Sequence, residues 1–272
     1  MVDEICGIPC EYSAPWCSSP PHPDIQVAGL VKGGFISGYE DYTLDDDLRR
    51  LVEGKRVAYV CPSPHLKGKG MGNFIDSHDL VVRIHQYCDL EEDLHEDYGK
   101  RCDILINCMN IHKLNALKDN PYFVKTLKYI ICSQVSCQDV ARVDNFLEST
   151  GIPYQNVSDG YLFKVFKEVG TTVNTGLLGL MALLHYPLKE LYITGMTFYN
   201  MNKMGDIYFN QYQEEATKYG NFRVIDGSPV ISDLRMDIHA QQPQIDYFRK
   251  LVNRYYPNKL KLDEFLTDNF NE

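Results

Sequence analysis

Three segments of this chain carry residue types that could act on a phosphate-bearing ligand or a hydroxyl group. Residues Asn174, Thr175 and Gly176 open a predicted helix, and the free N–H groups and dipole at a helix start suit a phosphate. His239 precedes a predicted helix over residues 243–255, and an imidazole with an unperturbed pKa of about 6.5 can take a proton from a hydroxyl at neutral pH. An ordinary helix cap and an isolated structural histidine are the plain alternatives.

The third segment, residues 57–72, is an apolar run followed by a loop that contains Gly68, Gly70 and Gly72. Glycines let backbone N–H groups approach a ligand closely, so this loop could hold a phosphate or a nucleotide. The loop has neither the G-x-x-x-x-G-K-[ST] order nor a G-x-G-x-x-G directly after the strand. A glycine-rich surface turn is the alternative.

Residues 57–85 resemble the large sialylmotif of the eukaryotic sialyltransferases, glycosyltransferase family 29. That motif runs from a strand through N-S and L-K-G-x-G-x-G to I-D-S-H-D-x-V-x-R-x-N. The matching residues here are Ser63, Leu66, Lys67, Gly68, Gly70, Gly72, Ile75, Asp76, Ser77, His78, Asp79, Val82 and Arg83. The resemblance implies donor contacts from Ser63 and from His85, which stands where the last asparagine of the motif usually lies.

Residues 174–199 are similar to the small sialylmotif, in which S-T-G-L is followed by an apolar helix and a strand that ends in glycine. The resemblance implies that Asn174, Thr175 and Gly176 bind the donor CMP.

The end of this segment is also similar to the G-x-D-F-Y of the bacterial sialyltransferases of family 42. That likeness implies that Tyr199 and Tyr208 contact the donor phosphate and support the leaving group, with Tyr212 as the alternative to Tyr208. It also implies a donor contact from Asn107. Both families place a catalytic base in an H-x-x-x-x-(E/D) setting, which corresponds to His239.

The chain departs from these patterns in ways that bear on the donor sugar. Pro62 and His85 replace asparagines, Asn174 replaces a serine or threonine, and Gln244 stands where an acidic residue usually follows the histidine. No cysteine follows residue 137, so the disulfide that joins the two motifs in Golgi enzymes is not expected. CMP-Kdo, another CMP-activated 2-keto sugar acid, is therefore an alternative to CMP-sialic acid.

Elements that position these residues can be predicted from periodicity. Strands are expected at residues 56–61, 79–84, 103–106, 128–133 and 190–194, with helices between them at 90–98, 122–127, 138–148 and 175–184. This alternation predicts an α/β fold with a mostly parallel, Rossmann-like sheet covered by helices on both faces, which the resemblance makes a single-domain GT-A-like variant. Ligands bind such sheets beyond the carboxyl ends of the strands, so the loops after residues 61, 84, 106 and 194 are the candidate site.

Residues 1–43 are expected to form an irregular extension and residues 44–272 the transferase domain. Asp45, Asp46 and Asp47 formally contain the D-x-D of metal-dependent glycosyltransferases, but they begin an amphipathic helix and are interpreted as its solvated start. A metal clip at Cys6, Cys10 and Cys17 would need His22 as a fourth ligand, and a cysteine-rich leader is the preferred interpretation. No metal or other cofactor is expected.

Composition limits the remaining classes of partner. A net charge of −10 argues against nucleic acid, and no segment reaches the roughly 20 apolar residues of a membrane helix. Nine cysteines without a secretion signal favour free thiols and a cytoplasmic location. Set against the resemblance to Golgi enzymes, the missing disulfide and membrane anchor add the expectation of a microbial or viral origin.

The sequence thus predicts an inverting, metal-independent transferase that uses a CMP-sugar donor and a glycan or glycolipid acceptor. The alternatives are a CMP-Kdo transferase, a different α/β transferase with a nucleotide donor other than CMP, and a catalytically silent nucleotide-sugar-binding protein.

Overall fold

The computed structural model describes residues 41–133, 140–198, 223–225, 228–230 and 240–270. The strands are β1 (Arg56–Val60), β2 (Leu80–Ile84), β3 (Ile104–Asn107), β4 (Tyr129–Cys132), β5 (Tyr154–Asn156), β6 (Glu190–Thr194), β7 (Arg223–Ile225), β8 (Ser228–Val230) and β9 (Leu260–Leu262). The α-helices are α2 (Asp46–Val52), α3 (Gly72–Asp76), α4 (His95–Tyr98), α5 (Ile111–Asp119), α6 (Pro121–Val124), α7 (Val140–Thr150), α8 (Asp159–Val169), α9 (Thr175–Leu184), α13 (Gln241–Tyr255) and α14 (Glu264–Phe270). Two 3-10 turns, η2 (Pro64–Leu66) and η3 (Glu92–Leu94), complete the described elements.

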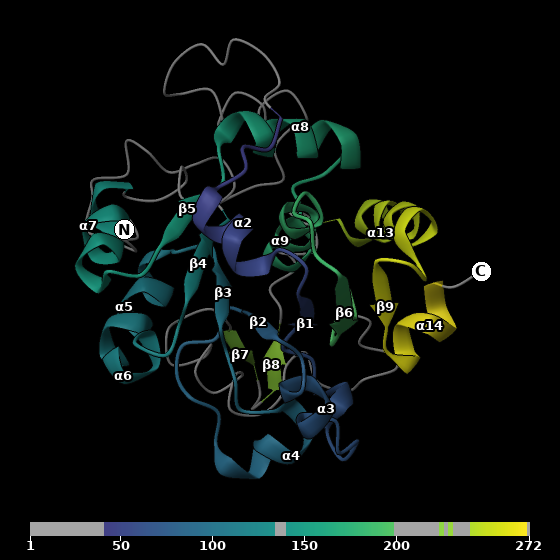
Figure 1. Ribbon diagram of the computed structural model, residues 1–272, viewed down its shortest axis with the longest axis horizontal. Helices are drawn as coiled ribbons and strands as arrows, with labels where there is room; N and C mark the ends of the chain where they lie inside the picture. Colours follow the sequence, from purple (N-terminus) through teal and green to yellow (C-terminus); the bar gives the residue numbers. More distant parts are fainter. Residues whose placement is uncertain (1–40, 134–139, 199–222, 226–227, 231–239, 271–272) are drawn as a thin grey trace.

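A seven-stranded sheet in the order β5-β4-β3-β2-β1-β6-β9 forms the centre of the molecule (Figure 1). Each neighbouring pair in it is parallel. The chain builds outward from β1 to β5 and then returns to the other side of β1 with β6. The order of the strands therefore reverses between β1 and β6, where open parallel sheets have their ligand crevice. The predicted parallel sheet is confirmed.

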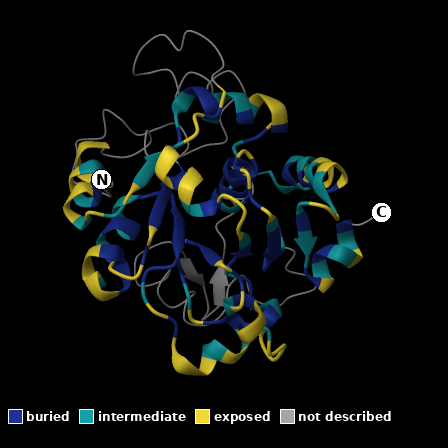
Figure 2. Ribbon diagram, in the orientation of Figure 1, coloured by how far each residue is buried: buried dark blue, intermediate teal, exposed yellow. Residues whose placement is uncertain are grey.

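Side chains alternate between the two faces of this sheet, as a pleated strand requires. Val57 and Tyr59 of β1 join one buried cluster with residues of α2, α8, α9, α13 and α14. Ala58 and Val60 point to the other face, where α3 and α4 cover the β1 side and α5 to α7 cover the β3 and β4 side. Figure 2 shows the result, with buried strands at the centre and exposed residues on the outer sides of the helices.

The five predicted strands match β1, β2, β3, β4 and β6 to within one residue at each end. The predicted helix over residues 90–98 is instead the turn η3 followed by α4. Strand β7 pairs antiparallel with β8 and lies outside the main sheet. Helices α3, α5 and α8 and strands β5, β8 and β9 were not predicted. Each of these three strands has only three residues, too few to show a period.

The acidic run at the start of α2 is a helix cap. The carboxylate of Asp45 accepts a hydrogen bond of 2.9 Å from the amide of Leu48, and Asp46 and Asp47 lie in the positive first turn. This confirms the interpretation of the D-x-D as a helix start. Tyr42, three residues earlier, already belongs to the core, since its ring stacks on His185 and is only 8% exposed.

Within the described part of the chain, no helix combines the length and apolar character needed to cross a membrane.

Candidate functional site

Three of the six predicted donor-binding residues lie at the carboxyl ends of parallel strands. Ser63 follows β1, His85 follows β2 and Asn107 ends β3. Helix α9 runs back across the sheet, so its start, from Asn174 to Gly176, lies at this same edge. The hydroxyls of Ser133, just after β4, and Thr175 lie 3.4 Å apart, which places that helix start beside the sheet edge.

The start of α9 is held in place by the strands beneath it. Asn174 is its N-cap, with Oδ1 accepting from the amide of Leu177 at 2.8 Å. The buried hydroxyl of Tyr59 donates to the carbonyl of Gly176 at 2.5 Å. Gly179 allows the close approach, since a Cβ there would overlap Ile106. A ten-residue helix thus presents its positive end at the sheet edge, where a phosphate would be favoured.

Asn107 offers a buried amide at the end of β3. Its side chain has no exposed area, and its Oδ1 accepts a hydrogen bond of 2.9 Å from the amide of Met109. Among the described residues, no acceptor lies within hydrogen-bond distance of its Nδ2. Because buried donors are rarely left without an acceptor, this nitrogen is suited to a ligand oxygen.

Ser63 and His85 are also fixed by their loops. Ser63 is 2% exposed, and its Oγ caps η2 through the amide of His65 at 3.4 Å, which leaves the hydroxyl hydrogen for another acceptor. His85 has a φ of 57°, an uncommon conformation outside glycine, and its amide donates to the carbonyl of Ile106 at 2.9 Å. These contacts turn the chain sharply as β2 ends.

The glycine loop does not offer open amides to a phosphate, contrary to the possibility that its sequence suggested. The amides of Gly68 and Gly70 donate to the two carboxylate oxygens of Asp97, at 2.6 and 2.8 Å. A Cβ on Gly72 would overlap the carbonyl of His95. The loop thus binds an anion, but that anion is a side chain of α4, and the third glycine allows α3 to pack on that helix.

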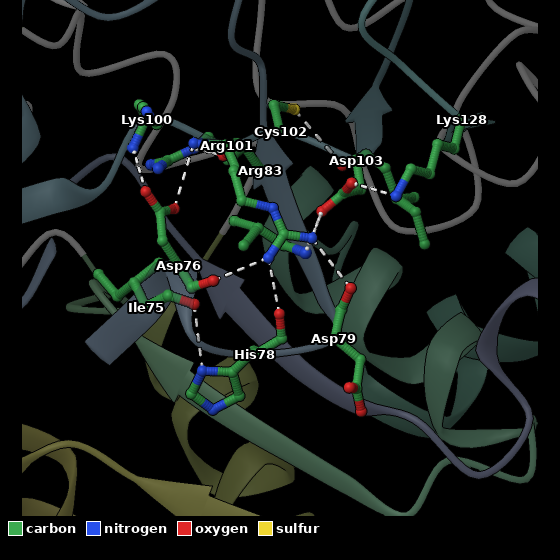
Figure 3. A network of polar contacts seen from close by, with 12 residues as sticks. Ile75, Asp76, His78, Asp79, Arg83, Lys100, Arg101, Cys102, Asp103 and Lys128 are labelled. Carbon is green, nitrogen blue, oxygen red and sulfur yellow. Dashed lines mark hydrogen bonds and ion pairs between the residues drawn. The ribbon is translucent and has the colours of Figure 1, made fainter. Parts of the chain in front are cut away.

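The second half of the large motif contributes to a polar network around the amino ends of β2 and β3 (Figure 3). These strand ends lie at the edge of the sheet opposite the candidate site. Asp76 accepts from the amides of Lys100 and Arg101. The guanidinium of Arg101 donates to the carbonyls of Asp76, His78 and Asp79. Arg83 is 3% exposed, and burial lowers its pKa from the ordinary value. Its nitrogens donate to the carbonyls of Tyr98, Gly99 and Arg101.

These motif residues therefore position strands and loops, and they do not face the candidate site.

Tyr199, Tyr208 and His239 lie outside the described residues. The helix that follows His239 is described, and it reaches the start of α9. Gln244, which has no exposed area, accepts from the amide of Asn174 at 2.9 Å and donates to the carbonyl of Ala240 at 3.2 Å. Gln244 thus joins the first turn of α13 to the start of α9.

The sequence did not indicate His65 and Asp263, which lie beside the point where the strand order reverses. Nε2 of His65 and Oδ2 of Asp263 are 2.7 Å apart, and both side chains are almost fully buried. They border a cavity of about 780 Å³ that Lys69, Tyr192 and Phe265 also line. The pair is separated by 198 residues, so no local pattern could have indicated it.

Two other observations limit the chemistry of this edge. Burial, with a smaller contribution from the charge of Asp263, raises the pKa of the Cys61 thiol well above its ordinary value, so this cysteine is a poor nucleophile. Across the described ranges, no three His, Cys, Asp or Glu side chains are grouped so that they could hold a metal ion.

No family model matches the chain, and no curated protein matches it. Its fold is similar to that of solved sialyltransferases. A mammalian sialyltransferase in complex with Gal-beta-1-3GalNAc-ortho-nitrophenol has a TM-score of 0.51 and 16% identity, over 90% of this chain and 80% of that chain.

The sialyltransferase CstII from Campylobacter jejuni, in complex with the substrate analogue CMP-3FNeuAc, has a TM-score of 0.51 and 21% identity, over 79% of this chain and 85% of that chain. At these identities the likeness shows the fold, and it confirms the resemblance to both groups at that level.

Proposed function

We propose that this chain is an inverting glycosyltransferase that moves sialic acid, or a related 2-keto sugar acid, from a CMP-sugar to a hydroxyl of a glycan or glycolipid. The observation that carries the proposal is the convergence of Ser63, Asn107 and the start of α9 on one edge of the sheet. These are the positions that the sialyltransferase motifs assign to the donor, and the fold is one that solved sialyltransferases share.

The proposed reaction is a single displacement. The acceptor oxygen attacks the anomeric carbon as the bond from that carbon to the CMP oxygen breaks, through an oxocarbenium-like state. His239 takes the proton of the acceptor hydroxyl, and CMP leaves with the bonding electrons. The charge on the leaving phosphate is stabilised by the N–H groups at the start of α9 and by the hydroxyls of Tyr199 and Tyr208. Hydrogen bonds supply this stabilisation, so the proposed mechanism uses no metal or other cofactor.

The contact between α13 and α9 supports the role of His239. His239 directly precedes Ala240, whose carbonyl accepts from Gln244, and Gln244 also holds the amide of Asn174. The chain segment that carries the proposed base is thus joined to the proposed phosphate site by two hydrogen bonds.

The proposal also includes the organisation and location of the protein. We assign residues 44–272 to the transferase domain and residues 1–43 to an extension. Cys61, Cys88, Cys102, Cys108 and Cys132 are free thiols. Thiols persist in reducing compartments, which supports a cytoplasmic location.

A donor panel tests the proposal. CMP release from CMP-sialic acid and from CMP-Kdo is measured with and without a mixture of glycan acceptors. We expect acceptor-dependent release with CMP-sialic acid. Faster release with CMP-Kdo would assign the alternative donor, and CMP binding without release would assign a silent binding protein. Thermal shifts with CMP, UMP and AMP test the choice of nucleotide.

His239→Ala then tests the base. Loss of the imidazole is expected to lower the transfer rate by a factor of about 10²–10⁴ and to leave CMP binding unchanged. His185→Ala is the matched control, because His185 follows α9 at the opposite edge of the sheet. Near-full transfer by His239→Ala would remove His239 from this role.

A further inference from the structure

Asp263 gathers hydrogen bonds from two loops on opposite sides of the point where the strand order reverses. It follows β9 and is 7% exposed. Its Oδ2 accepts from Nε2 of His65 at 2.7 Å, from the hydroxyl of Thr194 at 2.7 Å and from the amide of Gly195 at 3.2 Å. His65 belongs to the loop after β1, Thr194 ends β6, and Gly195 follows it.

The same two loops already touch through their backbones. The amide of Cys61 donates to the carbonyl of Thr194 at 2.9 Å. Gly195 has a φ of 75°, and a Cβ at this position would overlap the carbonyl oxygen of Cys61. Only glycine meets both conditions. Asp263, directly after β9, binds to both sides of this junction between the loop after β1 and the end of β6.

The carboxylate is suited to that role because it is ionised. Burial alone would raise the pKa of Asp263, but the hydrogen bond and charge of His65, with the bonds from Leu266 and Thr194, hold it below the ordinary value. Hydrogen bonds to an ionised acceptor are shorter and stronger than those between neutral groups. The two bonds of 2.7 Å fit this description.

We propose that Asp263 is a positioning residue of the donor site, which holds the loop of Ser63 and residues 194–198 in one fixed arrangement. The inference rests on the proposed function, because it takes these loops to bind the donor. Ser63 is two residues before His65, and Tyr199 is four residues after Gly195. Displacements of about 1 Å in a site can cost about 10²-fold in rate, so a carboxylate that ties both loops has a direct effect on transfer.

A purely structural role through α14 is the competing explanation. Oδ1 of Asp263 accepts from the amide of Leu266 at 2.8 Å, so Asp263 also caps that helix. The test must therefore separate the contacts of Oδ2 from those of Oδ1.

Substitutions at Thr194 separate them. Thr194 has no exposed area. Thr194→Val keeps the shape of the side chain but removes the hydroxyl that donates a hydrogen bond to Oδ2 of Asp263. Thr194→Ser keeps that hydroxyl. We expect KM for the CMP-sugar to rise about 10-fold in Thr194→Val and about 10–100-fold in Asp263→Asn. In Thr194→Ser, KM for the CMP-sugar should stay close to that of the parent protein.

Leu266→Ala is the matched control, because it empties a buried position of α14 without removing a partner of Oδ2. Its melting temperature should fall at least as far as that of Thr194→Val, while its KM stays within about twofold of the parent. Equal KM changes in Thr194→Val and Leu266→Ala would overturn the inference.

Amide hydrogen exchange tests whether Oδ2 of Asp263 fixes the two loops, and it needs no measurement of activity. Peptides that cover residues 61–66 and 194–198 should exchange faster in Asp263→Asn and Thr194→Val than in Leu266→Ala. If the parent protein transfers no sugar and binds no CMP, the proposed function fails, and faster exchange in these peptides would still support the junction. Unchanged exchange in them would overturn it.

Discussion

A hydrogen bond of 2.9 Å from the backbone amide of Asn174 to Oε1 of Gln244 joins the start of α9 to the first turn of α13. Both residues that this bond joins lie beside parts of the proposed active site. Asn174 caps the helix that is proposed to bind the phosphate, and Gln244 lies five residues after His239. The bond therefore couples the proposed phosphate site to the segment that follows the proposed base.

The first prediction concerns this bond. Gln244→Leu leaves the amide of Asn174 without its acceptor and should lower the free energy of unfolding by about 1–3 kcal/mol. Gln244→Glu keeps the acceptor and places a negative charge near two helix starts, where such a charge is favourable. The free energy of unfolding should therefore decrease less in this variant. Urea unfolding and CMP titration of both variants provide the measurement. Equal losses in the two variants would show that the acceptor is not what Gln244 contributes.

The second prediction concerns the large motif. Arg83→Met leaves the carbonyls of Tyr98, Gly99 and Arg101 without a buried donor, and should lower the free energy of unfolding by about 2–4 kcal/mol. The remaining folded protein should bind CMP within about twofold of the parent, because the carbonyls that the Arg83 guanidinium binds precede β3, at the amino edge of the sheet.

Lys128→Ala is the control for this variant. The ammonium of Lys128 pairs with Asp103 at 2.8 Å, but its side chain is 50% exposed. Exposed pairs contribute about 0–1 kcal/mol, so the loss should be small. A large decrease in CMP affinity in Arg83→Met, without loss of stability, would instead assign the arginine to the donor site.

Sequence patterns predicted the parts of the structure that depend on neighbours along the chain. Short apolar runs gave β1, β2, β3, β4 and β6, since a strand buried on both faces reads as an unbroken apolar stretch. The start of α9 was predicted from Asn174, a favoured helix cap. Because these strands are parallel, their carboxyl ends all lie at one edge of the sheet. The location of the candidate site at that edge could therefore be predicted from the order of the strands and helices.

Contacts between distant residues could not be predicted in this way. The sequence left open whether the glycine loop offers amides to a phosphate or forms a surface turn, and it could not show that Asp97, 29 residues beyond Gly68, binds those amides. The family pattern includes Asp76 and Arg83 without indicating that they bind backbone at the amino edge. Asp263 was missed because its partners lie on β6 and the loop after β1, far from it in the sequence.

The third prediction concerns the approach of α9 to the sheet. Gly179→Ala places a methyl group against Ile106 and 2.8 Å from the hydroxyl of Tyr59. Overpacking of this kind should lower the free energy of unfolding by about 1–3 kcal/mol. It should also weaken CMP binding, because the helix start must move to relieve the overlap.

Gly176→Ala is the matched control for the stability effect. A Cβ at Gly176 would lie 3.4 Å from Oδ1 of Asn174 and 3.6 Å from Sγ of Cys61, which are ordinary contacts. Alanine also favours a helix over glycine by about 0.5–1 kcal/mol. The melting temperature of this variant should therefore equal or exceed that of the parent. A similar decrease in both variants would contradict the role assigned to Gly179.

The fourth prediction is the pH dependence of the Asp263 junction. The pKa of Asp263 is lower in the folded protein than its ordinary value, despite burial, because of His65 and the other hydrogen-bond donors. Its contribution to stability is therefore present above the unfolded-state pKa of about 3.9 and is lost as the pH falls through the lower folded-state value. Asp263→Asn removes the charge at every pH. Urea unfolding of the parent and of Asp263→Asn should differ by about 1–3 kcal/mol between pH 5 and 7, and the difference should narrow below about pH 4. A difference that stays constant down to pH 3 would show that the carboxylate charge does not stabilise the junction.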